Sequence, residues 1–354
     1  MSQYVPFLKF KNNEVAAIKA LDKDLKEVLT PFFDIPRKST SMTEQELIST
    51  VDKAYRKYEI NLKNLPYFYL DNFDIDDNLK INNESNYMYI MEKFSDSKLI
   101  PVVGIDRTDE RNDAVFEAKK QKVISSDFIA LRLTQEDFKS YDLVEDEIGE
   151  LLDECADFFN GFHLVIDNRV CSHDIAHVSE QIVNFIANIQ SKYQFERIIV
   201  TGSSIPASIR DLLETETSKT LNRREVEIAK IVKEEVDIDF GDYACVSPDY
   251  SDVTFEGGVI RRMTAPKLFY PYDEYRLFIM RGAALDTHPK GNGQYADLSQ
   301  ILTGKAYYRK PAFSFGDKYL HEKAHHIGSD ATPSTVPKPL INLHITYLMK
   351  TPVI

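Results

Sequence analysis

Eight short runs rich in β-branched and aromatic residues recur along the chain, and amphipathic segments separate them. The runs cover residues 4–10, 30–36, 66–71, 99–106, 127–133, 162–167, 197–202 and 243–248. Such alternation is typical of parallel βα units. Eight units in regular succession, with no Gly-rich dinucleotide loop after the first run, predict a closed (β/α)₈ barrel of the TIM type. A doubly wound open sheet is the alternative.

Apolar residues at intervals of three and four predict the intervening helices. The first helix is predicted by Val15, Ile18, Leu21, Leu25 and Val28, and the helix before the seventh run by Ile175, Val178, Ile182, Phe185 and Ile189. Further helices are predicted at 47–55, 81–95, 110–121, 144–159 and 223–236.

The alternation of strand-like runs and amphipathic segments ends after residue 248. Residues 257–284 predict a β-hairpin that turns at Pro271, Tyr272 and Asp273. A loop-rich segment at 285–335 follows, and residues 341–350 could form the helix that closes the eighth unit. We therefore expect a barrel over 1–256 and a C-terminal elaboration over its mouth at 257–354, which is not an independent domain.

Composition restricts the class of protein. With 354 residues, 43% hydrophobic content, 21 Phe and 19 Tyr, the chain can bury one large core. A net charge of −13 opposes nonspecific attraction to nucleic acid, although a local basic groove could still exist. Three cysteines without CxxC spacing and no long apolar run predict a cytoplasmic protein with no disulfides and no membrane association.

Polar residues lie at the predicted carboxyl ends of the strands, which is where barrels of this type build their sites. They are Lys9, Asp34, Asp71, Asp106, Arg107, Arg132, Asp167, Asn168, Ser203, Ser204 and Asp249. Buried charges need partners, so this set predicts a hydrogen-bonded network or a polar pocket. Lys9, Asp71, Arg132 and Asp167 are the candidate catalytic residues, and the alternative is that the set consists of ordinary loop caps and ion pairs.

Two interpretations are open for Gly202, Ser203 and Ser204. Gly202 permits a close backbone approach, and the serines with a following helix N-terminus could bind an anion. Equally, Ser204 could be the N-cap of a helix with Pro206 in its first turn.

The metal-binding patterns are weak. Asp34, Asp71 and Asp167 could hold a divalent cation such as Mg²⁺, or with Lys9 and Arg132 the same set could bind a phosphate. His173 and His177 have a zinc-ligand spacing, but Asp174 stands where a zinc protease has Glu, which favours a surface or capping role. His321, His325 and His326 form a second cluster without a matching cysteine.

Ordered motifs along nearly the whole chain resemble the bacteriophage-type beta protein family. They include YVPFLKFKNNEVAAIKAL, VLTPFFDIP, YFYLDNF, IPVVGIDR, VTGSSIP, FGDYACVSPDY, LFIMRG, AFSFGDKYL and NLHIT. The resemblance implies functional positions at Lys9, Asp71, Arg132, Asp167, Ser203, Ser204, Asp242, Tyr243, Arg281, Gly316, Asp317 and His344. This chain has no Trp, where family members often have two.

The resemblance also implies a role in phage–host conflict, and three functions fit it. The first is an enzyme that acts on a phosphate-bearing small molecule or a nucleic-acid end, with Asp34, Arg107, Asn168 and Asp249 among its ligand contacts. The second is a binding subunit that recognises a phage component or a protein partner in a defence complex through Phe269, Tyr270, Tyr272, Tyr275 and Phe278. The third is a structural or regulatory protein on a degenerate barrel.

Overall fold

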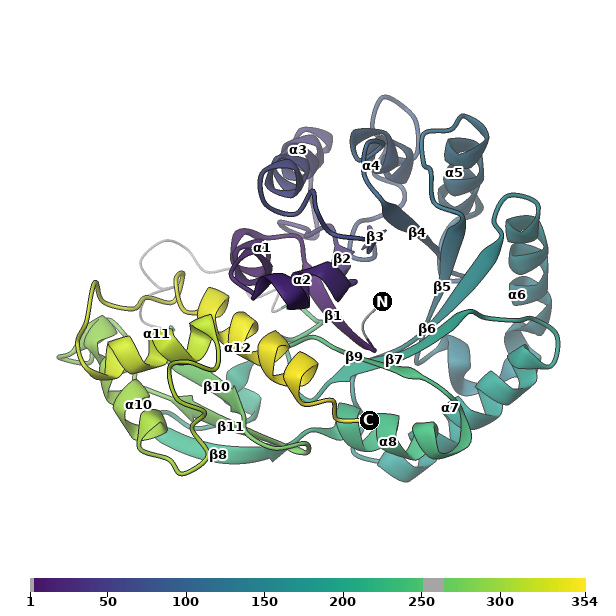
Figure 1. The fold of residues 1–354 in the computed structure, drawn as a ribbon. Coiled ribbons are helices and arrows are strands. Elements are labelled where there is room, and N and C mark those ends of the chain that lie inside the picture. The colour runs from purple at the N-terminus through teal and green to yellow at the C-terminus, as the bar shows by residue number, and fades with distance from the viewer. Residues whose placement is uncertain (1–2, 251–263) are drawn as a thin grey trace.

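Eight parallel strands close into a barrel in the computed structural model, which describes residues 3–250 and 264–354 (Figure 1). The strands are β1 (Tyr4–Lys9), β2 (Phe32–Asp34), β3 (Phe68–Asp71), β4 (Leu99–Val103), β5 (Phe128–Thr134), β6 (Gly161–Val170), β7 (Arg197–Ser203) and β9 (Asp239–Asp242). Strand β1 pairs with both β2 and β9, so the sheet has no edge. The predicted (β/α)₈ barrel is confirmed, and the open sheet is excluded.

The position of the eighth strand was predicted wrongly. Strand β9 covers Asp239–Asp242, and the predicted run at 243–248 is the turn that follows it. The backbone leaves the strand at Ala244, whose φ is 53° and whose N–H donates to Asp242 Oδ1 over 2.9 Å. Asp and Gly are poor strand formers, so the residues of β9 do not predict a strand.

Helices surround the barrel as the apolar spacing predicts, apart from one break. They are α3 (Glu44–Asn61), α4 (Asn86–Lys93), α5 (Asp109–Lys120), α6 (Tyr141–Ala156), α7 (Ile175–Gln190) and α8 (Arg224–Glu235). The predicted first helix is two helices, α1 (Asn12–Lys19) and α2 (Lys23–Val28). None of the described helices is both long and apolar enough to cross a membrane.

A second, antiparallel sheet has the strand order β10 (Lys267–Pro271), β11 (Arg276–Arg281) and β8 (Thr217–Asn222). The predicted hairpin is confirmed in its described part, and residues 257–263 lie outside the described residues. Strand β8 was not predicted. It comes from the connection between β7 and α8, where the sequence instead suggested a helix start near Ser204.

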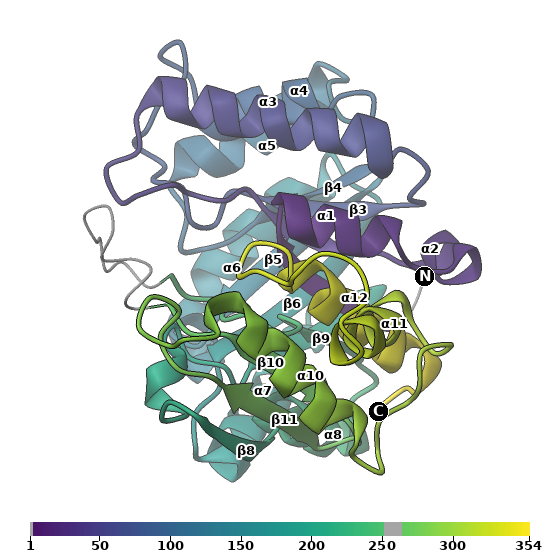
Figure 2. The ribbon, with the colours of Figure 1, turned by 90° about the vertical axis from the view of Figure 1, so that its left-hand side faces the viewer.

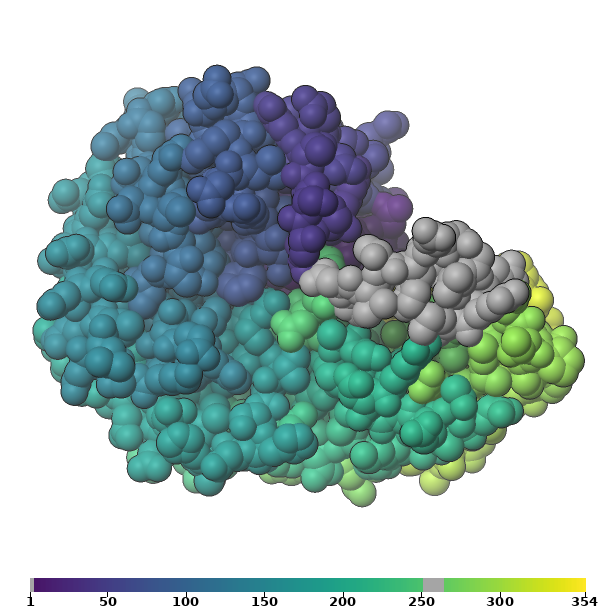
Figure 3. All heavy atoms as spheres, turned by 180° about the vertical axis from the view of Figure 1, so that it is seen from behind, coloured from purple at the N-terminus to yellow at the C-terminus, as the bar shows by residue number. Residues whose placement is uncertain are grey.

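Three helices complete the C-terminal part: α10 (Gln294–Thr303), α11 (Phe315–Ala324) and α12 (Pro337–Lys350). The first two lie within the segment expected to be loop-rich. Helix α12 packs against α1 and β1, so it takes the position of the eighth barrel helix, as predicted for residues 341–350 (Figure 2). Seen from behind, the C-terminal residues form one side of the molecule (Figure 3).

The interior of the barrel is layered, because alternate residues of each strand point inward. The middle layer is apolar and includes Phe7, Phe32, Val102 and Ile199. Inward positions at the carboxyl ends of the strands are polar, and these side chains form the candidate site. The layers of side chains fill the barrel and leave the site at its mouth.

Candidate functional site

The guanidinium of Arg132, on β5, is the centre of the polar layer. Its Nη1 donates to Asp34 Oδ1 at 2.7 Å and to Asp71 Oδ2 at 2.9 Å. Its Nη2 donates to Asp167 Oδ2 at 2.7 Å and to the Tyr243 hydroxyl at 3.0 Å, while Nε donates to Asp167 Oδ2 at 3.1 Å. All five N–H groups of this buried side chain are therefore used inside the protein, and Arg132 positions the carboxylates rather than offering a donor to a ligand.

The same contacts keep two of these carboxylates ionised. Burial would raise the pKa of Asp34, but the charges of Arg132 and Lys9 outweigh burial and hold that pKa well below its usual range. The pKa of Asp71 is lowered against burial by Arg107, Arg111 and Arg132. Asp34 and Asp71 are consequently suited to holding cations in place and poorly suited to donating protons.

The predicted divalent-cation ligands face this guanidinium. Asp34, Asp71 and Asp167 each accept from Arg132, so an arginine occupies the space between them. Across residues 3–250 and 264–354 no group of three or more His, Cys, Asp or Glu side chains has an arrangement suited to a metal ion. Arg132 therefore takes the position that a cation would need between these three carboxylates, and its own donors are not free to bind an anion.

Lys9 and Arg107 extend the layer toward solvent. Lys9 Nζ donates to Asp34 Oδ2 at 3.1 Å and to Asp74, which leaves one of its three N–H groups for another acceptor. Arg107 donates to Asp106 at 2.6 Å and to Asp71 at 3.3 Å, and its buried Nε has no partner. Both cations have donor capacity that the described protein does not use.

Arg169, which the sequence analysis missed, completes the group of cations. It lies at a bulge of β6 with a φ of 50°, a left-handed conformation that costs free energy in a residue with a side chain. Its N–H donates to Asp167 Oδ1 at 2.9 Å, and its Nη2 donates to Asp249 Oδ1 at 3.1 Å. The strained turn aims this arginine at the barrel mouth, where it also approaches the Tyr243 hydroxyl at 3.4 Å.

Two aromatic rings cover these cations. The guanidinium carbons of Arg107, Arg132 and Arg169 lie 4.7, 4.3 and 4.5 Å from the centre of the Phe73 ring. Lys9, Lys11 and Arg37 lie 5.1, 5.1 and 4.7 Å from the centre of the Tyr250 ring. Six cations thus meet two rings at the mouth. Neither ring was singled out from the sequence, although Phe73 ends the motif YFYLDNF and Tyr250 ends the motif FGDYACVSPDY.

A cavity of about 660 Å³ adjoins the mouth. Phe73 and Asp74 form part of its wall, together with Arg37 and the hydroxyl-bearing segment 39–41. A cavity of this size can take a small organic ligand.

A model of the family described as Beta protein matches residues 4–350. The chain belongs to the Beta protein family. No curated protein and no solved structure is significantly similar to it.

The positions implied by resemblance do not form one site, and most of them fall in three separate places of the structure. Lys9, Asp71, Arg132, Asp167 and Tyr243 meet at the mouth. Asp242, Ser204 and His344 meet outside the barrel wall, and Gly316 and Asp317 lie on α11.

The cluster around Asp242 joins α12 to the barrel. Asp242 accepts from Tyr4 and Arg223 and contacts His344 Nε2, each over 2.7 Å. Burial would raise the pKa of Asp242, but His344 and Arg223 lower it to about 2. Arg223 also donates to Glu225, which accepts from Ser204 over 2.5 Å. This buried cluster holds α8 and α12 against the barrel.

The helix start predicted at Ser204 is wrong. The first helical turn after β7 is a short 3₁₀ turn at Ile209–Asp211, and Ser208 caps it. The Ser203 hydroxyl accepts from Ile205 N at 3.1 Å, and a side chain at Gly202 would place its Cβ 2.5 Å from Cys171 Sγ. Gly202 therefore permits close packing of the chain on itself. The Ser204 hydroxyl accepts from Arg224 N, at the first residue of α8, over 2.8 Å, so Ser204 already satisfies a donor at the start of that helix.

The remaining predicted contacts lie apart from the mouth or at its edge. Arg281 donates to the Leu213 carbonyl at 2.6 Å, beside the second sheet. Asp317 accepts from Tyr270 at 2.6 Å and from Ser314 at 2.5 Å. Asn168 lies next to the mouth, but its side chain donates outward to the Thr201 carbonyl at 3.0 Å.

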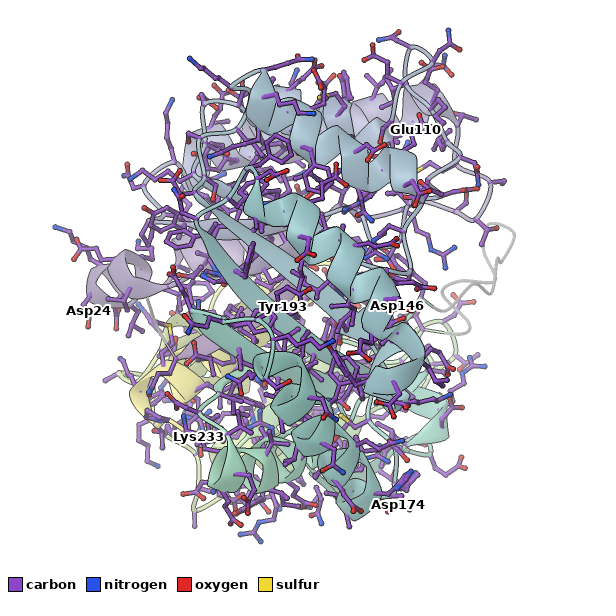
Figure 4. All side chains as sticks on the ribbon, turned by 90° about the vertical axis from the view of Figure 1, so that its right-hand side faces the viewer. Asp24, Glu110, Asp146, Asp174, Tyr193 and Lys233 are labelled. Carbon is purple, nitrogen blue, oxygen red and sulfur yellow. The ribbon has the colours of Figure 1, made fainter. Side chains whose placement is uncertain are left out.

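The histidine pairs differ in setting. Asp174 caps α7 on the outside of the barrel, so His173 precedes the helix and His177 lies within it (Figure 4). The rings of His321 and His325, at the end of α11, lie 4.2 Å apart and are tilted by 41° to each other. Together with Glu322 they have the His-Glu-x-x-His spacing of a zinc protease motif. The Glu322 carboxylate is 3.9 Å from Lys318, and no third ligand completes the pair within the described residues.

The aromatic residues proposed as a partner surface are mostly core. Phe269, Tyr270 and Phe278 are buried, and Tyr272 stacks on Tyr307 at 4.1 Å. Tyr275 is 41% exposed. Because most of this group is buried, the structure gives little support to a partner-binding surface made of these residues.

Proposed function

We propose that the protein binds a phosphate-bearing ligand at the barrel mouth and acts on it as an enzyme in phage–host conflict. The observation that carries the proposal is the convergence of Lys9, Arg107 and Arg169 on one mouth, where Lys9 and Arg107 each have a donor that no described residue takes up. The conflict setting rests on the likeness to phage-type beta proteins.

Charge supports an anionic ligand. The cations at the mouth are Lys9, Lys11, Arg37, Arg107, Arg111, Arg132 and Arg169, and the carboxylates are Asp34, Asp71, Asp74, Asp106, Asp167 and Asp249. Seven cations against six carboxylates leave an excess of one positive charge when all are ionised. This small local excess contrasts with the net charge of −13 of the whole chain.

The residues at the mouth fall into two groups with different roles. Lys9, Arg107 and Arg169 supply donors to phosphate oxygens, and charge-assisted hydrogen bonds of this kind are strong. Arg132, Asp34, Asp71 and Asp167 hold these donors in fixed positions, so that they stabilise charge that develops on the ligand. The ligand would be a phosphate-bearing small molecule or the phosphorylated end of a nucleic acid.

Isothermal titration of the purified chain with pyrophosphate tests binding. We expect saturable binding, and we expect Arg169→Gln to weaken it about tenfold through loss of one charge-assisted hydrogen bond. Arg276→Gln is the matched control, because Arg276 is exposed and also pairs with an aspartate, Asp273. Wild-type protein that binds no phosphate compound would contradict the proposal.

Phage challenge of cells tests the biological role. Asp71→Asn and Asp167→Asn keep the shape of the side chains but remove the charges that position Arg132, so both should abolish the effect on phage growth. A thermal melt of each variant separates loss of function from loss of the fold. Full activity in both folded variants would exclude the mouth as the functional site.

A further inference from the structure

The loop after β3 places a turn at the barrel mouth. Ile75 N donates to the Asn72 carbonyl at 2.8 Å, so Phe73 and Asp74 occupy the two central positions of a β-turn. Arg111 Nε donates to Asn72 Oδ1 at 3.0 Å, and Asn72 donates to Asn86 at 2.8 Å. These buried contacts anchor the start of the turn, and its tip reaches the cations of the mouth.

The two side chains of the tip contact different parts of the cation group. The Phe73 ring meets the guanidinium groups of Arg107, Arg132 and Arg169, whereas the Asp74 carboxylate accepts from Lys9 and lies 3.8 Å from Arg169 Nη2. A flat ring and an anionic group therefore occupy the mouth side by side. Burial raises the pKa of Asp74 although Lys9 opposes this, so the mouth compensates this carboxylate less well than Asp34.

We propose that Phe73 and Asp74 imitate the ligand, and that the ligand is a nucleotide. Its base would stack among the arginines in place of the Phe73 ring, and its phosphate would bind Lys9 and Arg169 in place of the Asp74 carboxylate. Arginine stacks on nucleobases and binds phosphate oxygens, and lysine binds phosphate as a point charge. This inference rests on the proposed function, whose ligand class it narrows.

The neighbouring cavity gives the displaced side chains a place to go. Phe73 and Asp74 both line the cavity of about 660 Å³, and Phe73 is only half-buried. Rotation of the two side chains into this space would uncover the cations while Asn72 stays anchored. The turn then competes with the ligand. The apparent affinity for the ligand is the intrinsic affinity multiplied by the fraction of time that the mouth is open.

Nucleotide titrations of the full chain test this competition. Wild-type protein should bind adenosine monophosphate more tightly than inorganic phosphate. Phe73→Ala and Asp74→Asn should each tighten nucleotide binding about tenfold, as expected if the mouth is open for about a tenth of the time in the wild type. Phe73→Ala should leave the affinity for inorganic phosphate nearly unchanged, because the ring competes only with the base.

Matched controls are available elsewhere in the chain. Asp273→Asn changes another turn aspartate that pairs with an arginine, and Phe315→Ala removes a partly exposed ring on α11. Neither should alter nucleotide affinity. Binding of a 5′-phosphorylated oligonucleotide is measured beside binding of the free nucleotide. The comparison shows whether the ligand is a free nucleotide or the end of a nucleic acid, and tighter binding of either one supports the inference.

Two results would overturn the inference and leave the proposed function standing. One is equal affinity for adenosine monophosphate and inorganic phosphate. The other is weaker or unchanged nucleotide binding in both folded turn variants. Absence of binding for every phosphate compound would instead remove the proposed function.

Discussion

His163 is a buried base at the amino-terminal end of the barrel. Its Nδ1 lies 2.7 Å from the Tyr69 hydroxyl, and burial together with the charge of Arg197 lowers its pKa to about 3. In the unfolded chain a histidine titrates near pH ~6.5. Between these values the unfolded chain takes up a proton that the folded chain does not, so stability falls as the pH falls below about 6.5.

We expect His163→Gln to reduce this loss. At pH 5 the unfolded histidine is protonated and the folded one is not, which amounts to about 2 kcal/mol of lost stability. Urea unfolding at pH 7 and pH 5 measures the effect, and the variant should lose about 2 kcal/mol less than the wild type over this interval. An identical loss in both proteins would show that His163 is not the group responsible.

Arg132 compensates three carboxylates, so its removal should be costly. Arg132→Met leaves Asp34, Asp71 and Asp167 without their shared partner, and we expect a loss of about 3–5 kcal/mol in the free energy of unfolding. Guanidinium denaturation measures it. Arg276→Met, at an exposed arginine, should cost less than about 0.5 kcal/mol. An equally small loss in Arg132→Met would show that the ion pairs of Arg132 do not stabilise the folded protein.

The candidate site was predictable in its barrel residues and not in its loop residues. Lys9, Asp34, Asp71, Arg132 and Asp167 stand at strand ends, and the closed topology brings strand ends together whatever the loops do. Phe73, Asp74 and Arg169 reach the mouth through a turn and a bulge. Their positions depend on backbone angles and tertiary contacts, which a short motif such as YFYLDNF does not specify.

At the scale of elements, Gly316 allows α11 and α12 to touch. A Cβ at this position would lie 2.0 Å from the Pro339 carbonyl oxygen, and Gly316 N donates to Asn342 Oδ1 at 3.1 Å. We expect Gly316→Ala to separate the helices and to lower the free energy of unfolding by about 1–3 kcal/mol. A thermal melt measures this loss.

Gly304→Ala is the matched control for the helix contact. Its Cβ would lie 3.4 Å from the nearest carbonyl oxygen, and the residue has an ordinary helical conformation. The control should change the melting temperature little. Equal melting temperatures for both variants would mean that the contact between α11 and α12 can relax without cost.

Elements with strong periodicity were predicted well, and elements with weak propensity were not. Helices α5, α6, α7 and α8 begin and end near their predicted bounds, because their apolar residues repeat every three or four positions. Strand β9 contains Asp and Gly, and strand β8 is polar and largely exposed. These two segments are strands because neighbouring strands pair with them. Their own residues therefore do not predict a strand.

At the scale of the whole molecule, the barrel depends on residues far beyond its last strand. The apolar face of α12 packs on α1 and β1, and His344 contacts Asp242 at the end of β9. A fragment of residues 1–256 should therefore lack a cooperative unfolding transition, which near-UV circular dichroism in increasing urea would show. A transition as steep as that of the full chain would mean that the barrel folds without its last helix.

The position of α12 also has a consequence for the order in which the chain can fold during synthesis. Strand β1 leaves the ribosome before its partner β9 and its covering helix α12, which follow more than two hundred residues later. Contacts between such distant segments form slowly, because a long loop must close before they stabilise anything. The nascent chain must therefore keep the apolar side chains of β1 and α1 from aggregating until residues 337–350 have emerged, which makes the first βα unit the segment most in need of chaperone protection.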